Sequence, residues 1–443
     1  MLDSAAGRAI KRKYRNLFRS REELLAENLT RFRQKLAFAH EHSPYYREIC
    51  ERDGIDPARA RPEDLPILTK RDLIENFDRI ATDPRVRRDA ITAFLQRSRD
   101  PAELFAGEFL VVHTSGTSGE VCYVAYRSRD WVRATSNFTR IALPGIRRRV
   151  AFIGATGGHY TAVSLAVARP ALTARFFYNT RAFNVNLPTA DVIRELAAFR
   201  PRILVGYAGA LRILAEARRR GQFRYRPRVI VSSGEALLPG DRQLVEETFG
   251  VRVRNLYASS EHLYMGLDVP RRKGEGMYLL EDDLIFELRD DCTLVTNLFN
   301  RTVPLFRYRM DDVLRPAARQ GAYGPYLIVE TLVGRNEHAP EFVNARGERD
   351  TIHPIVLAEF YVRHLTAFQV RLSGPDSFRF LAQLEEGLDE AARAAVEREI
   401  DARLRELLAE KGMENVRFAI ERVGELPPDP ETGKFRLIVP ERS

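Results

Sequence analysis

A short loop after the apolar residues 109–112 combines two glycines with four hydroxyl side chains. Glycine lets a chain bend tightly, and the backbone N–H and hydroxyl groups of such a loop can point at one anion. The loop is not a Walker A motif, because no Gly-Lys-Ser or Gly-Lys-Thr ends it. Taken alone, it fits a phosphate-binding loop and a flexible surface turn equally well. Its members are Thr114, Ser115, Gly116, Thr117, Ser118 and Gly119.

Polar and aromatic side chains also follow three predicted strands, at residues 203–205, 229–231 and 251–256. The carboxyl ends of parallel strands meet at one edge of a sheet, where ligands bind. A tyrosine ring can stack on a base, a serine can bond a phosphate oxygen, and a carboxylate can hold Mg²⁺. One cluster alone fits ordinary turn chemistry, but three at one edge predict a ligand site. The clusters are Gly206-Tyr207, Ser233-Gly234-Glu235 and Tyr257-Ala258-Ser259-Ser260-Glu261.

Three further residues are candidates for chemistry. Asp312 ends the segment 306–312, where a carboxylate can accept hydrogen bonds from vicinal ribose hydroxyls; an internal pair with an arginine is the alternative. Lys434 lies in a loop rich in helix breakers, and the chain has only seven lysines against 63 arginines. A compact ammonium there can act as a point charge at a phosphoryl centre, although a solvated terminal lysine is the simpler reading. His159 is a weaker candidate, for a substrate pocket.

The elements that must position these residues follow from the periodicity. Strand and helix patterns alternate at least three times from about residue 148 to 256, which predicts an α/β fold with a doubly wound parallel sheet. Residues 277–315 have strand patterns only and predict an antiparallel extension or a small barrel. Residues 8–40 predict one or two basic amphipathic helices, and the prolines between 42 and 70 argue against a long helix. A mixed α+β segment with a helix at about 389–411 follows, so we place a domain boundary between residues 333 and 334.

Composition narrows the function classes. The 443 residues carry a net charge of +9, which favours a polyanionic partner such as a nucleotide, a membrane surface or nucleic acid. No zinc finger, basic heptad array or RNA-binding aromatic motif supports nucleic acid. No apolar run reaches the roughly 20 residues of a membrane span, and no secretory signal is evident. Three scattered cysteines fit neither a disulfide framework nor a zinc cluster, so a reducing cytoplasm is expected.

The motifs described above, taken in their order along nearly the whole chain, resemble those of the adenylate-forming superfamily. Within it they resemble the phenylacetate–coenzyme A ligase-like group, which includes capsule-biosynthesis members. Two sequence motifs near the N-terminus are typical of that group: Ser43-Pro-Tyr-Tyr-Arg47 and Leu65-Pro-Ile-Leu-Thr-Lys70. The resemblance implies a large N-terminal adenylate-forming domain, residues 1–333, and a small mobile C-terminal α+β domain, residues 334–443.

The resemblance also implies a role for each matching residue. Residues 114–119 match the phosphate loop, and Ser233, Gly234 and Glu235 match a segment along the adenine. Tyr257-Ala-Ser-Ser-Glu261 is similar to Tyr-Gly-x-Thr-Glu, which implies Tyr257 on adenine, Ser259 and Ser260 near the α-phosphate and Glu261 on Mg²⁺. Asp312 would hold the ribose, Arg335 would lie at the domain junction, and Lys434 would be the adenylation lysine. The sequence departs from the family at Glu120-Val-Cys122, which brings no loop lysine, at Ala258, and at Glu337.

The implied activity uses ATP and Mg²⁺ to activate a carboxylic acid as an acyl adenylate, then passes the acyl group to coenzyme A. An aryl or arylacetyl acid is expected, with the pocket walls sought among Phe138, His159, Tyr160, Tyr207, Ala208 and Met265. Three alternatives stay open at this point. The acceptor can be an amine or a carrier-protein thiol, the chain can be a non-catalytic nucleotide-binding homologue, or its basic N-terminal helix can serve a membrane surface or a partner. Oligomeric state is open.

Overall fold

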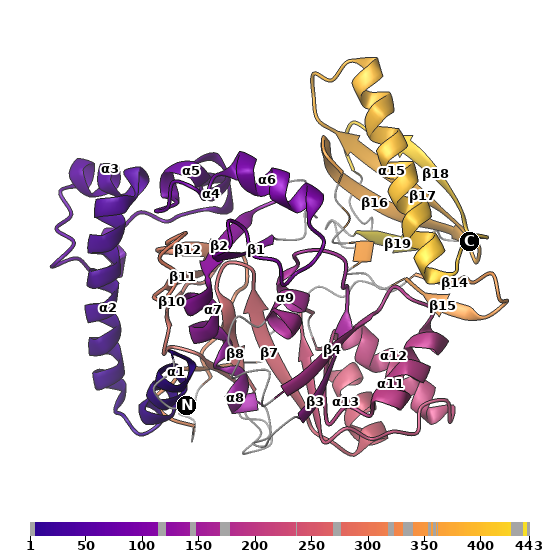
Figure 1. Cartoon of the computed structure of the whole chain (residues 1–443), viewed down its shortest axis with the longest axis horizontal. Coiled ribbons are helices and arrows are strands. Elements are labelled where there is room, and N and C mark those ends of the chain that lie inside the picture. The colour runs from indigo at the N-terminus through magenta and orange to yellow at the C-terminus, as the bar shows by residue number, and fades with distance from the viewer. Residues whose placement is uncertain are drawn as a thin grey trace.

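An eight-stranded sheet forms the centre of the molecule in the computed structural model (Figure 1). The structure describes residues 5–113, 121–141, 148–168, 178–235, 237–268, 276–317, 323–330, 340–352, 356–357, 360, 362–426 and 437–440. The strands run in the order β13-β9-β8-β7-β6-β5-β3-β4. Their bounds are β3 (Arg148–Gly154), β4 (Tyr178–Asn184), β5 (Ile203–Gly206), β6 (Val229–Ser233), β7 (Val253–Ser259), β8 (Leu263–Leu267), β9 (Met277–Leu279) and β13 (Ile328–Val329).

Five neighbouring strands of this sheet are parallel, as the alternating pattern predicts: β4, β3, β5, β6 and β7. After β3 the chain adds β4 on one side, then returns to add β5 on the other side. This reversal of strand order creates a topological switch point, next to which ligands bind in such sheets. The connecting helices are α9 (Thr161–Val167), α11 (Thr189–Phe199), α12 (Ala208–Arg219) and α13 (Pro239–Phe249).

Antiparallel strands extend this core, which confirms the expectation for residues 277–315. Strands β8, β9 and β13 continue the large sheet beyond β7. A separate sheet has the order β10-β11-β12, and a two-stranded sheet pairs β1 with β2. Their bounds are β10 (Leu284–Leu288), β11 (Thr293–Asn297), β12 (Tyr308–Met310), β1 (Phe109–His113) and β2 (Tyr123–Arg127).

Helices of the N-terminal third pack along one side and across the top of these sheets in Figure 1. Residues 8–40 form a pair of helices rather than one, because Ser20 begins the second with a capping box. A ten-residue helix then starts at Pro44, which occupies the first helical position and donates no backbone hydrogen bond there. The bounds are α1 (Ala5–Asn16), α2 (Arg21–His42), α3 (Pro44–Asp53), η1 (Pro62–Asp64), α4 (Lys70–Glu75), α5 (Phe77–Ile80), α6 (Arg88–Arg97), α7 (Ser128–Thr135) and α8 (Phe138–Ile141).

A buried acidic turn between β9 and β10 holds the N-terminal helices in place. Asp283 accepts hydrogen bonds from Arg12 and Lys13 of α1, from Arg31 of α2 and from Arg133 of α7. The preceding Asp282 pairs with Arg140 and bonds Asn16, and Glu281 pairs with Arg21. Both side chains of the Asp282–Arg140 pair are fully buried. Because buried charges need partners, this turn, which we call the acidic turn (residues 281–283), fixes α1 and α2 against the core.

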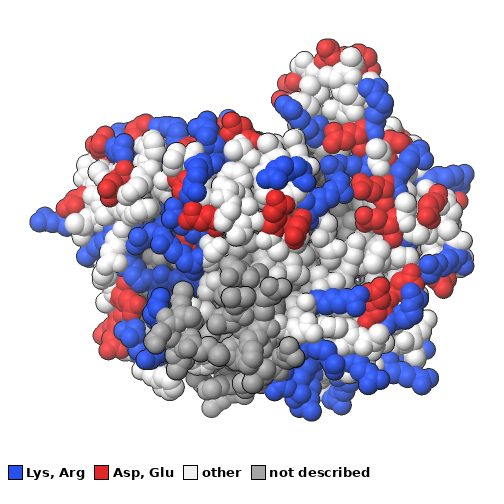
Figure 2. Space-filling model, in the orientation of Figure 1, with Lys and Arg blue, Asp and Glu red and all other residues white. Residues whose placement is uncertain are grey.

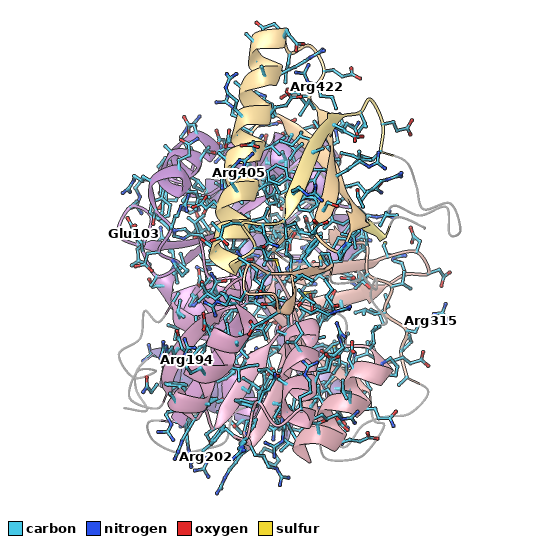
Figure 3. The ribbon with its side chains drawn as sticks, turned by 90° about the vertical axis from the view of Figure 1, so that its right-hand side faces the viewer. Glu103, Arg194, Arg202, Arg315, Arg405 and Arg422 are labelled. Atoms are coloured by element: carbon cyan, nitrogen blue, oxygen red, sulfur yellow. The ribbon has the colours of Figure 1, made fainter. Side chains whose placement is uncertain are left out.

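The C-terminal unit has an apolar core of its own, drawn from residues 342–438. Its sheet has the order β18-β17-β16-β19, and α15 lies beside it; Arg422 at the end of β18 pairs with Glu390 and Glu397 of α15 (Figure 3). The predicted helix at about 389–411 is therefore confirmed. The bounds are β14 (Glu341–Val343), β15 (Arg349–Thr351), β16 (Leu365–Gly374), β17 (Ser377–Leu384), α15 (Glu390–Lys411), β18 (Arg417–Arg422) and β19 (Ile438–Pro440).

Contacts between this unit and the large sheet meet at the start of α11. Asp350 accepts hydrogen bonds from the backbone N–H and the hydroxyl of Thr189, at 2.9 and 2.5 Å. Lys411 pairs with Asp350 at 3.2 Å and donates to the backbone oxygens of Val185 and Leu187. The predicted boundary at 333/334 lies outside the described residues and stays a prediction. In the described parts of the chain, no helix is long and apolar enough to cross a membrane.

Candidate active site

The turn between β7 and β8 carries the central residues of the candidate site. The Ser259 hydroxyl accepts a hydrogen bond from the backbone N–H of His262, at 3.1 Å, which closes the turn. Leu263 then has a φ of +58°, a left-handed conformation that costs a branched side chain about 1–3 kcal/mol. Its side chain is fully buried, so packing holds the strained residue in place. The turn thereby presents Ser260 and Glu261 at the carboxyl end of β7.

Tyr257 and Asp312 meet at this edge, although 55 residues separate them. The Tyr257 hydroxyl donates to Oδ2 of Asp312 at 2.7 Å. Burial and the neighbouring Asp312 carboxylate raise the pKa of Tyr257 well above its usual value, so the hydroxyl keeps its proton and remains a donor. The two residues that the resemblance assigns to adenine and to ribose therefore lie in direct contact.

Glu261 is held by a second tyrosine. The Tyr308 hydroxyl donates to Oε1 of Glu261 at 3.1 Å, and the Glu261 carboxylate side chain is almost fully buried. The Asn297 side chain also donates to the Glu261 backbone oxygen, at 3.4 Å. Strand β12 supplies Tyr308, and Asp312 follows two residues after that strand, so one segment positions both acidic residues.

Ser260 lies in a network of hydroxyl groups. Its side chain accepts a hydrogen bond from the Thr161 hydroxyl at 2.7 Å and donates to the backbone oxygen of His113 at 3.2 Å. The Tyr126 hydroxyl donates to the Ser260 backbone oxygen at 2.6 Å. His113 is the last residue of β1, so the end of this strand lies directly beside Ser260.

The carboxyl ends of β5 and β6 adjoin β7 at the same edge. Glu235 accepts a hydrogen bond from the backbone N–H of Gly209, in the first turn of α12, at 3.0 Å. A carboxylate is favourable at that positive end of a helix, but burial raises the pKa of Glu235 to about 7. Gly234 has a φ of +85°, and a Cβ there would meet Cε1 of Tyr207 at 2.7 Å, so only glycine fits beside this ring.

The residues predicted to line the acid pocket lie in two settings. His159 is buried, and its ring lies beside Phe94 with Nε2 3.1 Å from the Ser98 hydroxyl. Burial lowers the pKa of His159, which keeps the imidazole neutral. Tyr160 packs its ring 4.5 Å from that of His113, next to Ser260. Tyr207 and Ala208 are buried where β5 meets α12, and Met265 is buried in β8. The assignment of these residues to an acid pocket stays a prediction.

Several predicted residues lie outside the described part of the chain: Arg335, Lys434 and Thr114, Ser115, Gly116, Thr117, Ser118 and Gly119. Among the described residues, no group of three or more His, Cys, Asp or Glu side chains forms a metal site. Mg²⁺ keeps several waters and binds through one or two carboxylates plus substrate phosphates. The Glu261 side chain, a single buried carboxylate next to Ser260, fits that pattern.

Tyr308, Thr161 and Tyr126 are supporting residues that the sequence analysis missed. The segment Tyr308-Arg-Met-Asp-Asp312 drew attention to Asp312 alone, although the tyrosine at its start holds Glu261. Thr161 directly follows Tyr160, a predicted pocket residue, and this position is a weak indication that it lies near the site. Tyr126 is in a buried strand and carries no polar motif that would have singled it out.

Comparison with known proteins identifies the scaffold. The chain is 26% identical over 332 residues to a phenylacetate–coenzyme A ligase of Thermus thermophilus, a match that covers 66% of each chain and so just under two thirds of that relative. Two structures of 2-hydroxyisobutyryl-CoA ligase share the fold. The one in the thioesterification state, with 2-HIB-AMP and CoA, has a TM-score of 0.60 at 19% identity and covers 97% of this chain and 91% of the other.

The second, in the postadenylation state with R3-HIB-AMP, has a TM-score of 0.56 at 19% identity and covers 94% of this chain and 89% of the other. No protein-family model matches the chain. The mixed α/β architecture, the ordered motifs and the relative from Thermus thermophilus agree with one another. The chain is therefore similar in sequence to a phenylacetate–coenzyme A ligase and shares the fold of 2-hydroxyisobutyryl-CoA ligase.

Proposed function

We propose that this protein is an AMP-forming acid–coenzyme A ligase. The observation that carries the proposal is the convergence of Tyr257, Ser260, Glu261 and Asp312 at one edge of the sheet, through the Tyr257–Asp312 and Tyr308–Glu261 hydrogen bonds. These residues come from two segments about 50 residues apart. The first segment, Tyr257 to Glu261, and the second, which ends at Asp312, each match a different ATP-binding motif. A related ligase and a shared fold support the same reading.

In the first step, an oxygen of the substrate carboxylate attacks the α-phosphorus of ATP. The bond from that phosphorus to the bridging oxygen of pyrophosphate breaks, and an acyl adenylate forms. Negative charge grows on the phosphoryl oxygens, so the hydroxyls of loop 114–119 and the Lys434 ammonium would stabilise the transition state; losing one such group costs about 10²–10³ in rate. Mg²⁺, when bound through Glu261, would neutralise phosphate charge.

Asp312 and Tyr257 would position the nucleoside rather than react. The Asp312 carboxylate would accept hydrogen bonds from the ribose hydroxyls, and the Tyr257 ring would lie along the adenine. The Tyr257–Asp312 bond holds the two side chains at a fixed separation before ATP arrives. Preorganisation of this kind lowers the cost of binding, because little side-chain freedom is then lost.

In the second step, the thiol of coenzyme A attacks the acyl carbon. The bond to AMP breaks, the thiol proton is released, and a thioester forms. The C-terminal unit would turn about residues near Arg335 and withdraw Lys434 between the two steps. This rotation would break the contacts that Asp350 and Lys411 make with the start of α11, and the reverse rotation would restore them.

We propose an aryl or arylacetyl acid as the substrate. The ring of Tyr160, which packs against that of His113 beside Ser260, offers a face on which a flat acid can pack, and the buried ring of Tyr207 follows β5 at the same edge of the sheet. Met265, buried in β8, would form an apolar side of the acid pocket, and its flexible side chain can adapt to the shape of the acid.

Pyrophosphate release tests the proposal. A panel of aromatic and aliphatic acids is incubated with ATP and Mg²⁺, with and without coenzyme A, and pyrophosphate and AMP are measured. We expect acid-dependent pyrophosphate release, a thioester product only with coenzyme A, and loss of release in Lys434→Ala. Wild-type release by Lys434→Ala, or ATP binding without turnover for any acid, would contradict the proposed ligase.

A further inference from the structure

A cavity of about 430 Å³ lies between α1, α2, α7 and the turn after β11. Cationic side chains dominate its wall, with a single carboxylate, Asp130. Ala9, Gln34, Leu298 and Phe299 complete it. The size is that of a small-molecule site. The cations are Arg8 and Arg12 of α1, Arg31 and Lys35 of α2, Arg129 and Arg133 of α7, and Arg301.

We call this cavity the arginine pocket. None of its lining residues belongs to the C-terminal unit or to the cluster of Tyr257, Glu261 and Asp312. In Figure 2, Lys and Arg side chains border a recess on the side of the molecule where α1 and α2 lie. The arginine pocket is thus a feature separate from the proposed nucleotide site.

The acidic turn orients part of this wall but does not saturate it. Asp283 accepts hydrogen bonds from Arg12, Arg31 and Arg133. One carboxylate has about four acceptor positions, whereas each guanidinium carries five N–H donors. Arg12 also pairs with Glu27, and Arg31 also donates to the backbone oxygens of Asp282 and Leu298. These bonds still use fewer N–H groups than the three guanidinium groups carry, so the arginines are held in place with donors left over.

Crowding of the cations leaves the arginine pocket short of negative charge. Burial, with Arg133 and Arg12 nearby, lowers the pKa of Arg31. Arg301 stacks over the ring of Phe38 at 5.0 Å, which fixes its guanidinium without neutralising it. A bound anion would relieve this repulsion, and guanidinium groups bind phosphate oxygens in pairs.

Asp130 adds a requirement of a different kind. Its side chain is buried, and among the described residues its Oδ2 has no hydrogen-bond partner, although Oδ1 lies 3.9 Å from Nε of Arg129. Leaving a buried acceptor unpaired is costly, so a ligand in this cavity would be expected to donate to it. A hydroxyl group beside a phosphate meets both demands.

We propose that the arginine pocket binds a small organic phosphate that carries a hydroxyl group, such as a sugar phosphate. Arg129, Arg301 and the arginines around Asp283 hold the phosphate, and Asp130 accepts a hydrogen bond from the hydroxyl. The proposal does not depend on the ligase activity, because none of these residues is placed in the proposed nucleotide site.

The single tryptophan of the chain provides a readout. Trp131 follows Asp130 in α7 and is fully buried, so its fluorescence reports on the helix that carries two of the arginines. Glucose 6-phosphate is the probe, with glucose and inorganic phosphate as controls for its two parts. We expect saturable binding of glucose 6-phosphate, weaker binding of phosphate and none of glucose.

Variants locate the binding. Arg129→Gln and Arg301→Gln are each expected to weaken glucose 6-phosphate binding at least about tenfold, as loss of a charge-assisted hydrogen bond implies. Asp130→Asn should reduce the preference for glucose 6-phosphate over phosphate. Arg224→Gln, an exposed arginine elsewhere, and Asp312→Asn, in the nucleotide site, should leave binding unchanged.

Three results would overturn the proposal: no saturable binding to the wild-type protein, wild-type affinity in both arginine variants, or loss of binding in Asp312→Asn. Circular dichroism of each variant checks that it folds. Co-sedimentation with vesicles of phosphatidic acid and phosphatidylcholine separates the sources of the phosphate. Pelleting that glucose 6-phosphate competes away assigns the pocket to a lipid headgroup, and soluble binding without pelleting assigns it to a free metabolite.

Discussion

Asp312→Asn separates the charge of the Asp312 side chain from its shape. Asparagine keeps an oxygen that can accept the hydrogen bond from the Tyr257 hydroxyl, which lies 2.7 Å from Oδ2 in the structure. It replaces the other acceptor by an amide NH₂, which cannot accept from a ribose hydroxyl. We therefore expect the variant to fold normally and to bind ATP more weakly.

The size of the loss follows from the bond removed. A hydrogen bond to a charged group contributes about 1.5–3 kcal/mol. Because about 1.4 kcal/mol corresponds to a tenfold change in affinity, the Kd for ATP should rise roughly 10- to 100-fold. Isothermal titration calorimetry with ATP and Mg²⁺, in the absence of any acid, measures this directly and does not require the substrate to be known.

Asp311→Asn is the matched control. Asp311 is adjacent in sequence, but 96% of its side chain is exposed, and its partner Arg309 lies on the surface at 3.7 Å. We expect its Kd for ATP to stay within about twofold of wild type, as for an exposed ion pair. Equal affinities of Asp311→Asn and Asp312→Asn would refute the assignment of Asp312 to the ribose.

Three further predictions concern the scaffold. Gly234→Ala should lower the free energy of unfolding by about 2–4 kcal/mol, because its φ is +85° and the new methyl would meet Tyr207 at 2.7 Å; Gly240→Ala, with open space around it, should be nearly neutral in the same denaturant titration. Burial raises the pKa of Glu235 to about 7, above that of an unfolded glutamate, so the wild-type protein should lose stability as the pH rises from about 4.5 to about 7. Glu235→Gln should remove that loss, and parallel wild-type and variant profiles would contradict it. Asp283→Asn should cost about 3–5 kcal/mol in thermal or denaturant unfolding, because four buried or half-buried cations lose their shared partner; an unchanged midpoint would show that they are solvated instead.

Local patterns predicted most of the elements of the large sheet. The strands at 203–206 and 229–233 and the helices that follow them appear where their apolar runs and end signals placed them. Position along the chain also grouped the strand ends correctly, since parallel strands share an edge. The contact of Tyr257 with Asp312 agrees with the expectation that distant motifs would meet.

Local signals do not indicate where a partner from far along the chain decides the outcome. Thr189 begins α11, and its backbone N–H and hydroxyl both bond Asp350, 161 residues further along the chain. No periodicity in residues 8–40 indicates that Arg12 and Lys13 bond a carboxylate about 270 residues away.

The supporting shell of the site was the hardest part to foresee. Tyr126 reaches the Ser260 backbone and Tyr308 reaches Glu261 because the β1–β2 and β10–β12 sheets pack against the β7–β8 turn. A sequence lists residue types in order but does not state which sheets pack together. Such tyrosines therefore look like ordinary core residues until their hydroxyl partners are seen.

The acidic turn has a consequence for how the chain is made. A ribosome releases α1 and α2 well before residues 281–283, because 271 residues separate Arg12 from Asp283 and 260 separate Arg21 from Glu281. These two helices therefore complete their packing only after the acidic turn has been made. A variant that lacks α1 would keep Asp283 buried with only two of its four cationic partners, Arg31 and Arg133.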